Sequence, residues 1–131
     1  MKMKLCQAVI VMCVLAVGTL SWAYPVNVTT ELSPEVTSIV QVINSGGMQI
    51  ATVHFMVEGY PCGSYTLTSM APLVSSPPPC RVGNTILTVS RITFQSASPY
   101  SPGRVQFEGS VTSKSDNQTY PINFLIAEWT Y

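Results

Sequence analysis

Short runs rich in Val, Ile, Thr, Tyr and Phe, separated by turn residues, dominate the chain after its first 23 residues. No stretch there keeps the i, i+3, i+4, i+7 apolar spacing of an amphipathic helix, and prolines interrupt the sequence often. Such runs between turn signals are typical of an all-β sandwich or barrel. The sequence therefore predicts an immunoglobulin-like β-sandwich of about seven strands in two antiparallel sheets.

Seven runs are expected to form strands. They cover residues 26–31, 36–43, 48–57, 64–69, 85–95, 104–112 and 120–129. The second and third should pair as a hairpin around Gly46 and Gly47, because glycine reaches positive φ without steric cost. Alternation in the third predicts a buried face from Ala51 to Val57. The last run is apolar on both faces, which favours a central strand or one that lines a deep interior.

Two segments between these runs are expected to be irregular. Residues 58–63 are predicted to form a turn, since glycine and proline punctuate them. Residues 70–79 are predicted to form a loop, because the three prolines at its end have no N–H to donate to a sheet.

The first 23 residues match a secretory signal peptide. Lys2 and Lys4 precede an uncharged apolar run at residues 5–20, and a small-x-small pattern ends at Ala23. The run is short for a membrane-spanning helix, which needs ~20 residues. We therefore expect cleavage after Ala23 and one secreted or lumenal domain at residues 24–131, periplasmic in a bacterium, with no transmembrane span.

Charge argues against a nucleic-acid partner. The chain has six Lys and Arg and six Asp and Glu residues, and two of the lysines lie in the expected signal peptide. The mature chain would thus carry four cationic against six anionic side chains, a charge of −2. Without a basic patch, nucleic acid is not an expected partner.

Cys62 and Cys80 are the two cysteines that follow the expected cleavage site. Their spacing fits no metal motif, and export implies an oxidising compartment. They are expected to form a structural disulfide, worth roughly 3 kcal/mol in the chain-entropy model.

The sequence offers few groups for catalysis. His54 is the one histidine, and it alternates with Thr52 and Met56 on the more mixed face of its run. No nucleophile elbow, zinc-binding helix motif or phosphate-cradling loop occurs. We expect no catalytic residues, no metal site and no cofactor, and therefore no enzyme.

Two tripeptides match the N-glycosylation signal N-x-S/T. They begin at Asn27 and Asn117, and the second falls in a predicted hairpin turn. Both are candidate glycan sites if the source is eukaryotic.

The C-terminal half has a distinctive order of motifs. Cys80-Arg81-Val82-Gly83 leads into a long run, and a proline–glycine segment at residues 99–103 precedes the alternating run 104–112. A polar turn at residues 114–117 then leads into residues 122–126. This order resembles the ML lipid-recognition family, especially its phosphatidylglycerol/phosphatidylinositol transfer proteins. With the hairpin around Gly46-Gly47, which is similar to an early hairpin of the family, the resemblance covers residues 36–128.

The resemblance implies a secreted lipid-binding or lipid-transfer protein that holds an apolar tail between its two sheets. The residues expected to line that space are Val53, Phe55, Val57, Val105, Phe107, Ile122, Phe124 and Ile126. The proline-rich segment 71–79 would then lie near the rim of the opening. Two other interpretations stay open: the same residues fill an ordinary dry core, or the domain is an interaction or structural module of immunoglobulin-like or fimbrial-subunit-like type. In the second case the C-terminal strand could pair with the sheet edge of a protein partner.

Overall fold

The computed structural model describes residues 26–113 and 116–131, and this part of the chain contains nine strands and no helix. The expected signal peptide and Lys114 lie outside the described residues. The strands are β1 (Val26–Glu31), β2 (Val36–Ser45), β3 (Met48–Val57), β4 (Tyr60–Leu67), β5 (Leu73–Ser75), β6 (Cys80–Val82), β7 (Thr85–Gln95), β8 (Gly103–Ser113) and β9 (Gln118–Trp129).

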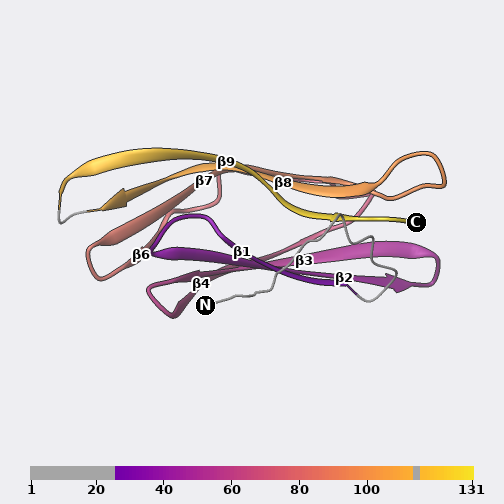
Figure 1. Ribbon diagram of the computed structural model, residues 1–131, viewed down its shortest axis with the longest axis horizontal. Coiled ribbons are helices and arrows are strands. Elements are labelled where there is room, and N and C mark those ends of the chain that lie inside the picture. The colour runs from indigo at the N-terminus through magenta and orange to yellow at the C-terminus, as the bar shows by residue number, and fades with distance from the viewer. Residues whose placement is uncertain (1–25, 114–115) are drawn as a thin grey trace.

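These strands form two antiparallel sheets, which confirms the predicted all-β sandwich. One sheet has the order β1-β2-β3-β4, and the other has the order β5-β7-β8-β9, with β6 also paired to β7. Figure 1 shows the layer of β7, β8 and β9 above the layer of β1 to β4. Each sheet follows chain order, whereas immunoglobulin sheets combine strands from distant parts of the chain. The likeness to immunoglobulin domains is therefore one of architecture.

All seven predicted strands are present, and two predicted irregular segments contain more strand than expected. Glu58 and Gly59 close the β3–β4 hairpin alone, with φ of 50° and 83°, so β4 already begins at Tyr60. Two consecutive residues of positive φ make the tightest common hairpin turn. The predicted loop 70–79 contains β5, which pairs with β7 at Ile92. The prolines follow β5 rather than interrupt it.

Alternation correctly predicts the buried face of β3. Ala51, Val53, Phe55 and Val57 are all fully buried. The ring centroids of Phe55 and Phe107 lie 5.2 Å apart across the two sheets. Aromatic side chains therefore fill the centre of the sandwich.

One end of the sandwich is closed by a buried glutamine. Gln49 Nε2 donates to Ala97 O (2.9 Å), and Gln49 Oε1 accepts from Ala97 N (2.8 Å) and Trp129 Nε1 (3.0 Å). Gln49 is 7% exposed and Trp129 is 1% exposed. A Cβ on Gly103 would overlap the Trp129 ring. At this end, here called the glutamine end, the buried amide of Gln49 has hydrogen-bond partners and the side chains are tightly packed.

The opposite end is tied at the β4/β6 edge. The Cys62–Cys80 disulfide joins the two sheets there, with Cα atoms 5.7 Å apart, as predicted. Thr85 Oγ1, on the buried first residue of β7, donates to Glu58 Oε2 at 2.6 Å. The β3–β4 turn is thus bonded to the facing sheet beside the disulfide.

The last strand is an edge strand, so the predicted central position is wrong. β9 pairs with β8, and a bulge leaves Ile126 as the extra residue between Leu125, opposite Gln106, and Ala127, opposite Val105. Ile126 and Ala127 are both buried, whereas Leu125 is exposed. The run is apolar on both faces partly because the bulge shifts the alternation.

Candidate functional site

An apolar groove lies at the end of the sandwich opposite Gln49, between the β1–β2 turn and the start of β9. Its volume is about 620 Å³, within the range of small-molecule sites. Its lining residues are Leu32, Ser33, Pro34, Glu35, Val111, Ser113, Asp116, Tyr120, Pro121, Ile122, Asn123 and Phe124. Leu32 and Val111 are also core residues, so the floor of the groove is continuous with the core.

Strand register places the apolar wall of this groove on the inner face of its sheet. Tyr120 is opposite Val111, Ile122 is opposite Gly109, and Phe124 is opposite the buried Phe107. Directly opposed residues share a face. Tyr120 is nevertheless 50% exposed and Phe124 is 45% exposed. These inward side chains lack cover because β9 begins beyond the β1–β2 turn, as the yellow strand in Figure 1 shows.

The β1–β2 turn is held by its own hydrogen bonds. Leu32 N and Ser33 N both donate to Val36 O, at 2.8 and 3.2 Å. Ser33 Oγ accepts from Glu35 N and donates to Glu35 Oε1, both at 3.2 Å. Glu58 N donates to Glu35 O (2.8 Å), which fixes the turn to the next hairpin. The groove is therefore bordered by an ordered turn that presents Pro34 and Glu35.

A second carboxylate lies in the turn between β8 and β9. Asp116 Oδ1 accepts from Gln118 N (3.0 Å), and Asp116 Oδ2 accepts from Tyr120 Oη (2.8 Å). That hydrogen bond raises the pKa of the Tyr120 hydroxyl, and burial and the negative charges of Asp116 and Glu35 raise it further. Tyr120 therefore stays protonated and directs its hydroxyl to the acidic border of the groove.

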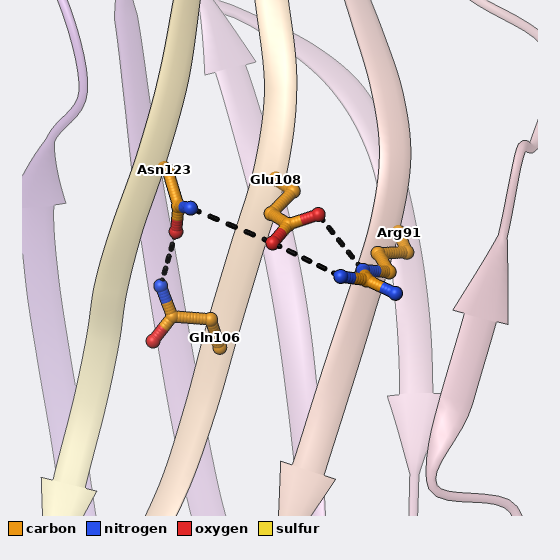
Figure 2. Close-up of polar contacts among 4 residues, drawn as sticks. All are labelled: Arg91, Gln106, Glu108 and Asn123. Atoms are coloured by element: carbon orange, nitrogen blue, oxygen red, sulfur yellow. Dashed lines mark hydrogen bonds and ion pairs between the residues drawn. The ribbon is translucent and has the colours of Figure 1, made fainter.

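A polar ladder on the outer face links side chains of β7 and β8 to β9, the strand that carries the groove wall. Figure 2 shows Arg91 on β7, Glu108 on β8 and Asn123 on β9 joined side by side. Arg91 donates to Glu108 Oε1 at 2.8 Å and to Oε2 at 3.2 Å, and Gln106 donates to Asn123 Oδ1. The pair with Glu108 raises the pKa of Arg91. The ion pair is exposed and joins β7 to β8, so it should stabilise the sheet only slightly.

The residues predicted to line a ligand space divide into two groups. Ile122 and Phe124 line the groove. The others are fully buried in the core between the sheets: Val53, Phe55, Val57, Val105, Phe107 and Ile126. Segment 71–79, expected near a ligand, contributes no residue to this groove. It lies with the disulfide at the β4/β6 edge, whereas the groove lies beside β9, at the far edge of the second sheet.

Other candidate residues lie on the surface. His54 is exposed on the outer face of β3, between Ile39 and Ser64. Asn27 is exposed on β1, and Asn117 is exposed in the β8–β9 turn with φ of 59°. Within residues 26–113 and 116–131, no group of three His, Cys, Asp or Glu side chains could hold a metal ion. No helix long and apolar enough to cross a membrane occurs among the same residues.

Sequence reasoning missed the part of the groove that comes from turns. Leu32, Pro34 and Glu35 lie outside the predicted strands, and Asp116 falls in a predicted polar turn. Tyr120 alternates with Ile122 and Phe124, a signal that could have identified it. Which turn faces that strand depends on how the sheets pack, and no local pattern shows it.

Comparisons of the chain with protein-family models, curated proteins and solved structures found no match.

Proposed function

We propose that this protein is a secreted, non-enzymatic lipid-binding or lipid-transfer protein that holds the apolar part of its ligand in the groove. The observation that carries the proposal is the half-exposed state of Tyr120 and Phe124, although register directs both toward the inside of the sandwich. Apolar side chains exposed in a concave site lose contact with water when a ligand covers them, which favours binding.

The position of the groove changes the binding mode that the ML resemblance implies. The contact between Phe55 and Phe107 occupies the centre of the sandwich. A ligand tail therefore lies along the β9 edge against Ile122 and Phe124, with its inner side on Leu32 and Val111. The disulfide and the signal peptide expected from the sequence agree with a protein that works outside the cytosol.

Two neighbouring residues of β9 provide the test. Phe124 lines the groove and is 45% exposed, whereas Leu125 is 41% exposed and faces the other way, opposite Gln106. Binding of a twelve-carbon nonionic detergent, dodecyl maltoside, is measured by calorimetry below its micelle concentration. Phe124→Gln should weaken binding about tenfold, because a large apolar contact is lost. Leu125→Gln changes an apolar side chain of similar exposed fraction outside the groove and should leave the affinity unchanged.

Native mass spectrometry of the purified protein is the complementary measurement, and a co-purified lipid is expected. A ligand-free mass together with no detergent binding would contradict the proposal. If Phe124→Gln and Leu125→Gln weakened the affinity for dodecyl maltoside equally, the detergent would not bind in the groove.

The second candidate, an interaction module that adds its C-terminal strand to a partner, has one observation in its favour: β9 is an edge strand. Its last residues are anchored, however, because Trp129 is buried and donates to Gln49. A deletion of Thr130 and Tyr131 alone leaves that anchor intact. Loss of a protein partner on this deletion, with no loss of detergent binding, would favour the module.

A further inference from the structure

We propose that the groove selects amphiphiles with a cationic, ammonium-type head and disfavours anionic lipids. The inference deepens the proposed function and depends on it. Its basis is the charge of the described lining residues, among which the ionised side chains are all carboxylates, while the floor and one wall are apolar.

The described lining includes two carboxylates, Glu35 and Asp116, and no Lys, Arg or His. They approach Tyr120 from two different turns, β1–β2 and β8–β9, and both charges act on its hydroxyl. An anionic head placed at Tyr120 would meet both carboxylates, whereas a cationic head would be attracted to both.

Nearby cations do not offset these carboxylates within the described part of the chain. Arg91 is paired with Glu108 and Arg104 with Glu128, both on exposed side chains of the second sheet. Arg81 Nε donates to Gly83 O on the β6–β7 turn. Lys114 follows the lining residue Ser113 in sequence and lies outside the described residues.

Aromatic residues add to the same preference. Tyr120 and Phe124 are four residues apart on β9, with Ile122 between them on the same inner face, and both are half-exposed at the groove. The face of an aromatic ring attracts a cation, and quaternary ammonium groups are the ligands that such rings favour. A trimethylammonium head can contact the Tyr120 ring without leaving a hydrogen-bond donor unsatisfied, since it has none, while Phe124 contacts the apolar chain.

The test compares three amphiphiles that share a twelve-carbon chain and differ in head charge. Dodecyltrimethylammonium, dodecyl maltoside and dodecanoate are titrated separately by calorimetry, each below its micelle concentration and at low salt. The cation should bind about tenfold more tightly than the anion, because an exposed charge pair contributes a few-fold and two carboxylates act together. The preference should decrease at 0.5 M salt. Chemical shifts of Tyr120, Ile122 and Phe124 should change on binding.

Charge variants separate this inference from the proposed function. The pair Glu35→Gln and Asp116→Asn should remove the preference, so that dodecyltrimethylammonium and dodecanoate bind with equal affinity. Glu128→Gln removes one negative charge at the far end of β9 and should keep the preference. Equal or tighter binding of dodecanoate by the unmodified protein would overturn the inference and leave the proposed function standing. Binding of none of the three would overturn both.

Discussion

The two ends of the sandwich close the space between the sheets in different ways. At the glutamine end, Gln49 bonds to Ala97 and Trp129, so side chains of β3 and β9 join across the core. At the groove end, the disulfide and the Glu58–Thr85 hydrogen bond tie the β4/β6 edge. The β9 edge is left with inward apolar residues half-exposed. The disulfide and this hydrogen bond thus lie away from the edge at which we propose that the ligand binds.

The largest effect should come from breaking the glutamine end. Trp129→Ala removes a fully buried indole and should lower the free energy of unfolding by about 3–5 kcal/mol. Urea unfolding measures this loss. Tyr131→Ala is the control, since Tyr131 is exposed and its loss should change stability by less than about 0.5 kcal/mol. Similar losses in both variants would show that Trp129 does not anchor this end.

Removing the disulfide at the groove end should cause the next largest decrease in the free energy of unfolding. The double substitution Cys62→Ala and Cys80→Ala should cost about 3 kcal/mol, because the cross-link restricts the unfolded chain. Reduction of the unmodified protein should bring it to the stability of the double variant. The variant itself should not respond to the reductant. If the reductant also destabilised the double variant, the loss of stability on reduction would not come from the Cys62–Cys80 disulfide.

A smaller loss is expected when the buried amide is removed and the indole is kept. Gln49→Ala leaves Ala97 N and Trp129 Nε1 without their acceptor, and a buried unsatisfied donor costs about 1–3 kcal/mol. Gln41→Ala, on the exposed outer face of β2, is the matched control. If both variants unfold at the same urea concentration, the amide does not hold this end closed.

The smallest expected effect is a change in the pKa of Tyr120 at the acidic border of the groove. The Tyr120 hydroxyl should titrate above its ordinary pKa of about 10, because it donates to Asp116. The folded-state pKa is raised, so this stabilisation is present at neutral pH and is lost as the pH rises through that pKa. Carbon-13 NMR of the tyrosine ring follows the titration. Asp116→Asn should lower the Tyr120 pKa, and an unchanged value would disprove the link.

Local alternation predicts which strand faces point inward, but not how either end of the sandwich is closed. It predicts the inward face of β3 from Ala51 to Val57, and the same period places Gln49 on that face. It cannot show that Ala97 and Trp129 would satisfy the Gln49 amide, since those residues are distant in sequence. Burial of Ile126 follows from alternation, but exposure of Phe124 does not, because it depends on where the facing sheet ends.

Short strands were the other limit of prediction. β5 and β6 have three residues each, too few for a period to be recognised. They form because β7 is long enough to pair with both, at Ile92 and at Leu87. Prolines between them indicate correctly that no single continuous strand spans this segment.

The bulge and Pro121 together have a consequence for self-association. A long, flat, apolar edge strand invites copies of the same chain to add to it and aggregate. β9 exposes Tyr120, Phe124 and Leu125, yet the extra residue Ile126 increases its local twist, and Pro121 has no N–H to offer an incoming strand. The β9 edge can therefore expose apolar side chains to a small molecule, although a second copy of the chain would pair with it poorly.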